Sequence, residues 1–580
     1  MRPRSCCLSC LALLCCVAAP ARADWPAQGK PVLYVMQSTR GIISAQILDT
    51  PSGDLMVVGE GQGGNGAGWN AVRVTRDGDV APGWTLTGTC LGTSSFGYGA
   101  AYHGLAMGNT GELWHVRRPS SGTYGLNIVS PTGPLSTYCS AGQIEGIGTG
   151  AAGIPGSSDG YIVTGQSTVR RLTSSGATAA GWPAGGVVAM QGRDTGLEFD
   201  PCLLPDGEGG VVVLEMTADG PVVSRVDGNA VRHAGWPAAG LPLGGPPSCF
   251  SLSLPVWRLA PSGPDHVLAL WVESPDCAGT LRAKMQRFGL DGTLDPAWPA
   301  GGLEVVALGV NENVTLVADG EGGAHVLWES NGLPRGTHVR PVGSFYPGLD
   351  AQGLPLLPIG AQYVRLKRAG PAPWLNSSSD VRYLVADRGL DAGLVFVWSE
   401  PSDPTQNSTR AMRVRWLRAD LTPEPAEPDA GLLVHDDSGN SYAAVQRAAH
   451  ADGAGGIFLA WESFLGDPSP AYDWPLAMTR VARPSVASVP PSAPTTLALA
   501  LASPNPVRGG IALRLFLPNN APARLDLFDV AGRRHRSIEV GGAGEHVQRF
   551  DDLGDLGAGV CFARVTQGGE SRTLHFVRLR

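Results

Sequence analysis

Acidic side chains recur at one place in a repeated pattern along the chain, and they are the first candidates for chemistry. Each ends a run of apolar residues, as in "DGEGGAHVLWE" at 319–329. The recurrent residues are Glu215, Glu273, Glu329, Glu400 and Glu462. They are either a ring of carboxylates around a channel, able to bind Ca²⁺ or a cationic ligand, or solvated strand ends. Because a hard cation needs several oxygen ligands converging within one loop, the second interpretation is favoured.

A second acidic feature is the doublet Asp436 and Asp437 in "VHDDSGN". A carboxylate pair could serve glycoside chemistry, but a polar turn explains this doublet more simply. The sequence contains no HExxH and no His-x-His arrangement. We therefore predict no catalytic, cofactor-binding or metal-binding residues. An enzyme that acts on extracellular polysaccharide, as a hydrolase or a lyase, is the alternative, because its carboxylates could come from distant repeats.

Six cysteines lie beyond residue 23: Cys90, Cys139, Cys202, Cys249, Cys277 and Cys561. Disulfides between Cys90 and Cys139 and between Cys202 and Cys249 are plausible, since each would join neighbouring repeats. Single buried thiols explain the same residues equally well. No C-x-x-C occurs among the six, so structural zinc is not expected.

The first residues carry an export signal. Arg2 and Arg4 precede an apolar stretch from Leu8 to Ala19, and Ala21-Arg22-Ala23 has the small-x-small pattern of a signal peptidase site. Residues 1–23 are therefore predicted to be a signal peptide. No later segment approaches 18 consecutive apolar residues, so no transmembrane segment is expected. A lipoprotein is the rival interpretation, given Cys10, Cys15 and Cys16.

Charge and composition restrict the partners. Hydrophobic residues make up 43% of the chain and charged residues 16%, and the formal net charge is −8. Its arginines are spread thinly instead of forming a basic stripe, so nucleic acid is not an expected partner.

The elements that must position these residues repeat along the chain. Eight apolar runs follow Asp-Gly, Ser-Gly or similar turns and begin 48 to 70 residues apart, at Leu55, Leu113, Tyr161, Val211, Val267, Ala324, Leu394 and Ile457. A continuous apolar run indicates a strand buried on both faces. An alternating strand with outward arginines follows in many repeats. Four repeats then end on Trp84, Trp182, Trp236 and Trp298, which are expected to pack between neighbours.

Units of this kind predict an all-β chain, with a β-propeller of about seven or eight blades at residues 24–482. The repeats resemble the β-propeller-type repeats of large exported bacterial proteins. We expect "PVLYVM" (Pro31 to Met36) to pair with the last repeat and close the ring. A solenoid or a string of β-sandwiches is the rival architecture.

A second domain follows a linker. Residues 483–496 are rich in Pro, Ser and Thr, and residues 497–580 contain alternating strands at 511–517, 523–530, 546–550, 560–566 and 572–579. Short strands at this spacing predict a small immunoglobulin-like β-sandwich.

The second domain resembles the C-terminal sorting domain of the type IX (Por) secretion system, and equally the immunoglobulin-like domain related to flagellar hook-capping proteins. The motif residues that carry the resemblance are Pro504, Asn505, Pro506, Asp529, Gly532, Arg533, Gly557, Gly559 and Phe562. The resemblance implies a type IX-like secretion machinery as partner, and secretion or attachment at the cell surface. The sequence thus favours an exported, non-catalytic binding or adhesion scaffold for a glycan or a protein.

Overall fold

The fold is described from a computed structural model. It covers residues 25, 29–34, 42–63, 66–94, 103–108, 110–117, 125–131, 151–153, 159–164, 168–190, 202–217, 220–244, 257–274, 281–309, 314–330, 333–357, 365–366, 383–401, 410–436, 445–462, 475–484, 497–501, 507, 510–550, 553 and 555–579. The chain divides into two compact units, residues 1–484 and residues 485–580. The predicted signal peptide, Asp437 and the motif residues Pro504, Asn505 and Pro506 lie outside the described residues.

The first unit contains eight separate sheets in the part of the chain that is described, and we number them as blades in chain order. Blade 1 consists of β2 (Ile42–Asp49), β3 (Leu55–Gly63), β4 (Gly66–Val74) and β5 (Thr89–Ser94), and blade 2 consists of β6 (His103–Met107), β7 (Leu113–Arg117) and β8 (Gly125–Val129). Blade 3 consists of β9 (Ala151–Gly153), β10 (Gly160–Thr164), β11 (Thr168–Leu172) and β12 (Val187–Val188). Blade 4 consists of β13 (Cys202–Pro205), β14 (Val211–Thr217), β15 (Gly220–Val226) and β16 (Leu241–Pro242).

Blades 5 to 8 follow the same plan. Blade 5 consists of β17 (Trp257–Pro261), β18 (His266–Glu273), β19 (Leu281–Gly289) and β20 (Leu303–Leu308), and blade 6 consists of β21 (Val314–Ala318), β22 (Ala324–Ser330), β23 (Leu333–Arg340), β24 (Ser344–Phe345) and β25 (Leu354–Pro355). Blade 7 consists of β26 (Arg365–Leu366), β27 (Tyr383–Arg388), β28 (Leu394–Pro401), β29 (Arg410–Leu417) and β30 (Leu432–Asp436). Blade 8 consists of β31 (Val445–Ala451), β32 (Ile457–Glu462) and β33 (Pro475–Val481), joined by β1 (Lys30–Tyr34).

The strand β1 closes the ring by completing the last blade. It pairs antiparallel with β33, with Lys30 opposite Met478 and Tyr34 opposite Pro475. Val32 and Leu33 of β1 are fully buried. The sequence-based expectation that this segment joins the last repeat is confirmed for the residues described.

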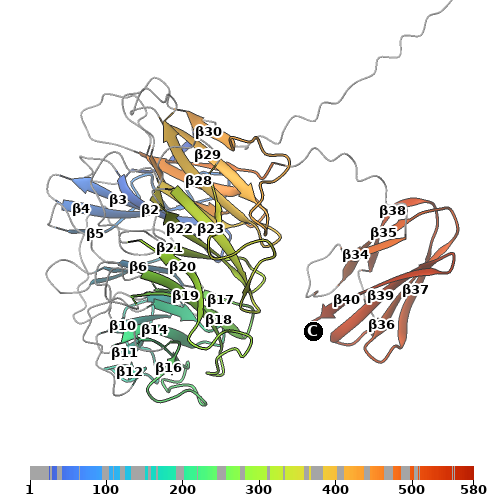
Figure 1. The fold of residues 1–580 in the computed structure, drawn as a ribbon, viewed down its shortest axis with the longest axis horizontal. Helices are drawn as coiled ribbons and strands as arrows, with labels where there is room; N and C mark the ends of the chain where they lie inside the picture. Colours follow the sequence, from blue (N-terminus) through green and yellow to red (C-terminus); the bar gives the residue numbers. More distant parts are fainter. Residues whose placement is uncertain are drawn as a thin grey trace, which may run out of the picture. The chain divides into compact units, whose positions relative to one another are not determined.

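The inner strands of the blades are β2, β6, β9, β13, β17, β21, β27 and β31. From β6 to β31 each of them contacts the next, and β31 contacts β2, so the last and first blades are neighbours (Figure 1). The hydrophobic clusters lie between consecutive blades; one of them joins β18 and β19 of blade 5 to β22 and β23 of blade 6. The predicted all-β propeller is thus confirmed, with a core made of layers between sheets.

The second strand of each blade fits the continuous apolar pattern of its sequence. β14 and β22 are buried almost throughout, as their continuous apolar runs predict. The third strands differ from expectation in places: β15 is buried along its whole length, although its Arg225 was expected to face outward. The reason is that the neighbouring blade covers this face.

The second unit is a sandwich of two sheets, in the orders β34-β35-β38 and β37-β36-β39-β40. Its strands are β34 (Ala498–Leu501), β35 (Ile511–Leu517), β36 (Ala523–Asp529), β37 (Arg534–Val540), β38 (Gly544–Phe550), β39 (Gly559–Gln567) and β40 (Glu570–Arg578). Leu513, Leu527 and Ala563 are among the fully buried residues between the sheets. The sequence pattern located five of these strands and missed β34 and β37.

Candidate functional site

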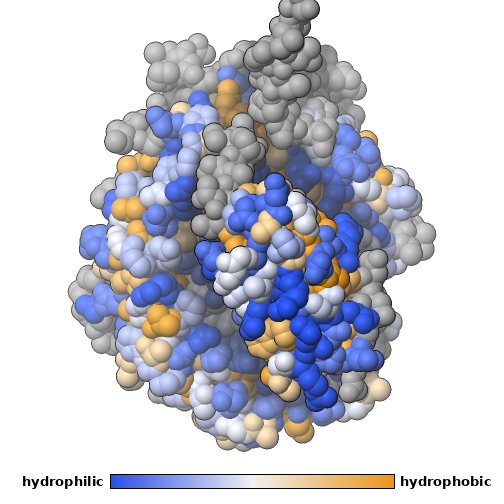
Figure 2. Space-filling view, turned by 90° about the vertical axis from the view of Figure 1, so that its right-hand side faces the viewer, coloured by the Kyte–Doolittle hydropathy of each residue, from blue (hydrophilic) through white to orange (hydrophobic). Residues whose placement is uncertain are grey.

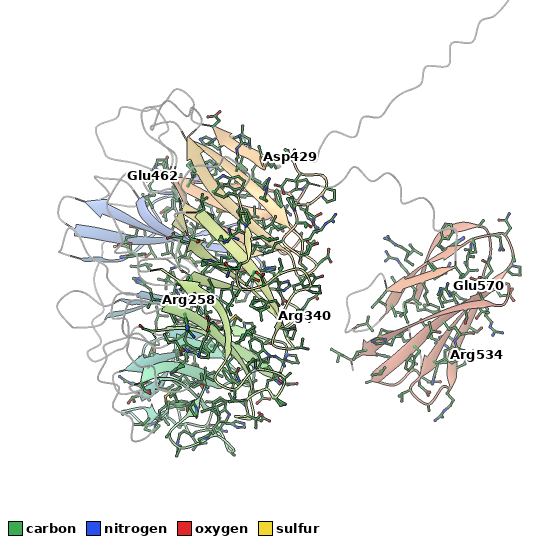
Figure 3. All side chains as sticks on the ribbon, in the orientation of Figure 1. Arg258, Arg340, Asp429, Glu462, Arg534 and Glu570 are labelled. Atoms are coloured by element: carbon green, nitrogen blue, oxygen red, sulfur yellow. The ribbon has the colours of Figure 1, made fainter. Side chains whose placement is uncertain are left out.

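The two ends of the blades differ. In an antiparallel blade, the turn after the first strand and the turn after the third lie at the same end. We call this end the turn face; it carries the short turns 50–54, 206–210, 319–323 and 452–456. The same face carries the connections after the third strands, which span 13 or 14 residues in blades 1, 3, 4, 5 and 7, such as 227–240. At the opposite end, the loop face, the number of residues between consecutive strands varies, from two between β14 and β15 to fourteen between β16 and β17. Figure 3 shows Arg340 and Asp429 toward one end of the blades and Glu462 toward the other.

A buried ion pair organises the turn face of blade 4. Asp206 Oδ1 accepts hydrogen bonds from the backbone amides of Glu208 (2.8 Å) and Gly210 (2.7 Å), and Gly207 takes the positive φ of 78° that this turn requires. Asp206 Oδ2 accepts a hydrogen bond from Arg225 Nε at 2.8 Å. Arg225 Nη1 then donates to the carbonyl oxygen of Leu290 in blade 5, also at 2.8 Å. One carboxylate thus fixes its own turn and, through the arginine, joins the next blade.

This contact, which we call the blade latch, recurs around the ring. In blade 1, Arg73 donates to Asp54 Oδ2 (2.7 Å) and to the carbonyl oxygen of Pro131 in blade 2 (3.1 Å). In blade 3, Arg171 contacts Asp159 Oδ2 (2.9 Å) and the carbonyl oxygen of Gly228 (3.3 Å). The acid and the base lie 19 residues apart in blades 1 and 4. This spacing of acid and arginine is the sequence signal that could have predicted the contact.

Blade 6 replaces the arginine of the latch by histidine. His338 Nε2 lies 2.9 Å from Asp319 Oδ2, and its Nδ1 lies 2.8 Å from the carbonyl oxygen of Ala419 in blade 7. Burial acts to raise the pKa of Asp319, but hydrogen bonds from His338 and from the amides of Glu321 and Gly323 hold it below its usual value. His325 stacks on His338 at 4.2 Å, and burial together with His338 lowers the pKa of His325 to about 3.

The four recurrent tryptophans also join neighbouring blades, as predicted. Each is 5% to 7% exposed, and each indole Nε1 donates to a backbone carbonyl oxygen of the next blade at 2.8 to 3.4 Å. The donors are Trp84, Trp182, Trp236 and Trp298, and the acceptors are Pro131, Gly228, Leu290 and Pro341. The carbonyl oxygens of Pro131, Gly228 and Leu290 therefore accept from both the tryptophan and the arginine of the preceding blade.

Blade 7 has Glu427 at the sequence position of this tryptophan, in "TPEPAEPDAG" against "TLDPAWPAGG" of blade 5. Glu427 accepts hydrogen bonds from Arg415 Nε and from the amide of Trp416, both at 2.8 Å. Burial raises the pKa of Glu427, although these two donors oppose the rise. Trp416 Nε1 instead reaches the next blade, at the carbonyl oxygen of Gly455 (2.8 Å).

A cluster of titratable groups lies where the ring closes. His450 of blade 8 donates from Nε2 to Asp49 Oδ2 of blade 1 (3.0 Å), and its Nδ1 lies 3.2 Å from Asp387 Oδ2 of blade 7. Arg76 adds an ion pair to Asp49 at 2.5 Å. Burial acts to lower the pKa of His450, but the hydrogen bonds to Asp387 and Asp49 outweigh it and raise that pKa to about 9. This closure cluster therefore holds an imidazolium between two carboxylates and joins three blades.

The recurrent glutamates do not form the ring of carboxylates that one interpretation proposed. They lie on the second strands of their blades, one strand outward from the inner strands. The favoured interpretation, a solvated strand end, is also wrong for Glu215, Glu329 and Glu462, which are only 3% to 7% exposed because adjacent blades cover both faces of these strands. Glu273 pairs with Lys284 at 2.7 Å. Glu400 is the penultimate residue of β28, and its side chain is not among those described.

Asp436 is exposed at the end of β30. Cys90 is disulfide-bonded, whereas Cys202 is a free thiol, so the suggested Cys202–Cys249 disulfide is wrong. Burial raises the pKa of the Cys202 thiol, which lies on β13 near Arg258 of β17.

Among the described residues, no group of three or more His, Cys, Asp and Glu side chains is arranged to hold a metal ion. No helix that could span a membrane occurs in the same part of the chain.

In the sandwich, the motif residues Asp529, Gly532 and Arg533 shape the hairpin between β36 and β37. Asp529 Oδ1 accepts a hydrogen bond from the amide of Arg533 (2.9 Å), and Gly532 has a φ of 76°. His535 lies 2.9 Å from Asp529 Oδ2, and this contact holds the pKa of Asp529 below its usual value. Gly557 and Gly559 lead into β39, on which Phe562 is half-buried.

No protein-family model matches the sequence, and no curated protein matches it. Solved structures that match include the alpha-L-arabinanase of Penicillium chrysogenum (11% identity, TM-score 0.28, 80% of this chain and 98% of that chain) and the alpha-L-arabinofuranosidase of Fusarium graminearum (8%, 0.28, 78% and 98%). Prolyl oligopeptidase B of Galerina marginata also matches (8%, 0.31, 84% and 58%).

Proposed function

We propose that the chain is an exported, non-catalytic scaffold that binds an extracellular glycan or protein through the loop face of its ring. The observation that carries this proposal is the structural difference between the two faces of the ring. Buried ion pairs and connections of nearly constant length fix the turn face, whereas the connections at the loop face differ in length from blade to blade. Connections that vary on a rigid framework suit binding, since recognition residues concentrate on variable loops held by a fixed framework.

We further propose that the C-terminal sandwich delivers the ring to the cell surface or the medium through a type IX-like secretion machinery. Its support is the resemblance of the motif residues to a sorting domain, together with a sandwich fold that forms a compact unit of its own. In this proposal residues 1–23 direct the first export step across the inner membrane.

The binding proposal is tested with the mature full-length chain. Purified protein is sedimented with insoluble arabinan, cellulose, chitin and peptidoglycan and is passed over immobilised extracellular protein from the same culture. In parallel, release of reducing ends and of unsaturated sugars is measured from the soluble polysaccharides. We expect retention on one of these materials without any product. Product release would instead establish the alternative, a polysaccharide hydrolase or lyase, and retention on none would refute the binding role for these classes.

A further inference from the structure

The outer face of the four-stranded sheet of the sandwich carries an apolar patch, partly overlain by the guanidinium of Arg564. Alternation along the strands puts Phe528, Val560, Phe562 and Val577 on this face, and Val530 follows directly after β36. Phe528 is opposite Phe562, and Val560 is opposite Val577. Val530 is 77% exposed and Val560 44% exposed, while the two phenylalanines are half-buried.

The patch is not needed for the sandwich core. The opposite sides of the same strands supply Leu527, Cys561 and Phe576, which are buried between the two sheets. Two half-buried aromatic rings and three valines, of which Val530 and Val560 are exposed, lie in neighbouring positions on one face and exceed the isolated apolar residues normal on a surface. The face turned to the viewer in Figure 2 shows hydrophobic and hydrophilic residues interspersed in small areas.

The rim of the patch is basic. The guanidinium of Arg564 lies 5.2 Å from the centre of the Phe528 ring, and Arg533 in the adjoining hairpin is 82% exposed. Arg524 and Arg534 extend over the neighbouring Asp526, whose carboxylate is buried and paired with them. Figure 3 shows Arg534 at the edge of the sandwich. Arg533 pairs with Asp529 in the same way, so the rim carries four arginines against two carboxylates and keeps a net positive charge.

We propose that this apolar patch, with its arginine rim, is the docking surface for a protein that presents an apolar centre and an acidic rim. Resting on the proposed function, that partner is a component of the secretion machinery. Aromatic side chains and arginine are enriched at protein interfaces, and complementary charge at the rim speeds association and excludes wrong partners. A second copy of the sandwich is disfavoured, because face-to-face pairing would bring arginine rims together.

The test uses the full-length chain in a bacterium with a type IX system. Four variants are compared: deletion of residues 485–580, Phe528→Ser with Phe562→Ser, Arg564→Glu, and the matched control Val547→Ser. Val547 is 49% exposed on the other sheet, so its substitution removes a similar exposed apolar group outside the patch. Protein in the periplasm, on the surface and in the medium is quantified by immunoblot.

We expect the double phenylalanine variant and Arg564→Glu to lower the exported amount at least tenfold and to accumulate in the periplasm, with Val547→Ser exported like the wild type. If the deletion blocks export but the patch variants are exported normally, the docking surface is refuted and the sorting role stands. If the deletion itself is exported normally, the sorting role fails, and the proposal falls with it.

Two further measurements exclude other causes. Thermal unfolding of the purified variants shows whether they fold; should the double variant unfold, Val560→Asp replaces it, since this side chain is already exposed. Sedimentation velocity of the wild type and co-sedimentation with anionic phospholipid vesicles test the other occupants. If the wild type forms a dimer that only the patch variants lose, the patch binds a second copy of the chain, and the proposal is overturned. If the wild type binds vesicles and only the patch variants fail to bind, the patch binds a lipid surface, and the proposal is likewise overturned.

Discussion

Arg225 and Asp206 illustrate, at the scale of single residues, how the ring is held together. Their side chains are only 3% and 1% exposed, and the arginine also reaches blade 5. We expect Arg225→Met to lower the free energy of unfolding by about 3–5 kcal/mol, because it leaves a buried carboxylate without its cation. The matched control is Arg282→Met. Arg282 pairs with Glu304 at 3.0 Å, but both side chains are more than 40% exposed, and the expected loss is below about 1 kcal/mol.

Urea unfolding of the two variants decides this prediction. Equal losses of stability for Arg225→Met and Arg282→Met would show that the blade latch contributes no more than a surface ion pair.

The blade latch also shows why the sequence pattern did not predict this contact between blades. The repeated Asp and the alternating Arg were both visible, but the carbonyl oxygen that links them to the next blade belongs to a residue of any type, so no motif marks it.

The closure cluster predicts a dependence of stability on pH. The pKa of His450 is raised to about 9 in the folded chain and is about 6.5 when unfolded. The imidazolium therefore stabilises the fold fully below pH 6.5, and this contribution is lost as the pH rises through 9. We expect the free energy of unfolding to fall by about 2 kcal/mol between pH 6 and pH 10. This is less than the change in the pKa of His450 alone would give, because Asp49 is half-exposed to solvent.

The measurement for the closure cluster is the urea midpoint of the wild type and of His450→Gln from pH 6 to pH 10. The two proteins should differ below pH 7 and converge near pH 10, since the neutral imidazole no longer pairs with Asp49 and Asp387. Parallel curves over this range would rule out the pairing as the source of the pH dependence.

At the scale of elements, the sequence predicts best where one physical cause acts alone. The second strands were located because burial on both faces demands a continuous apolar run, and the four tryptophans because a large ring at a fixed place in each repeat packs between neighbours. β37 was missed because its sequence, "RHRSIEV", is polar at an edge of its sheet. The glutamates were misassigned because burial by an adjacent blade leaves no mark in the blade's own sequence.

The strand β1 allows a direct test of ring closure. Leu33 is fully buried against the first and last blades, so we expect Leu33→Ala to lower the free energy of unfolding by about 2–5 kcal/mol. Leu86→Ala is the control, because Leu86 is 37% exposed, and it should change stability by about 0.5 kcal/mol or less. Urea unfolding of both variants measures the difference; a Leu33→Ala protein as stable as the control would show that β1 is dispensable for closure.

For the whole molecule, the division into two compact units predicts two separate unfolding transitions in calorimetry. Each unit has its own hydrophobic core, so a substitution in one core should leave the other transition in place. Leu527→Ala, in the sandwich, is expected to lower the free energy of unfolding by about 2–5 kcal/mol, which corresponds to a fall of about 10–25 °C in the transition temperature of a unit of this size. Arg225→Met should shift only the transition of the ring.

This pair of variants also decides how the sorting role and the binding role relate. Two independent transitions would mean that the sandwich can be recognised, and even removed, while the ring keeps its fold and its loop face. If Leu527→Ala shifted both transitions equally, the two units would unfold as one, and loss of the sandwich would expose the ring to unfolding. The proposed export through the sandwich would then require that the sandwich be retained after passage, because the ring would depend on it for stability.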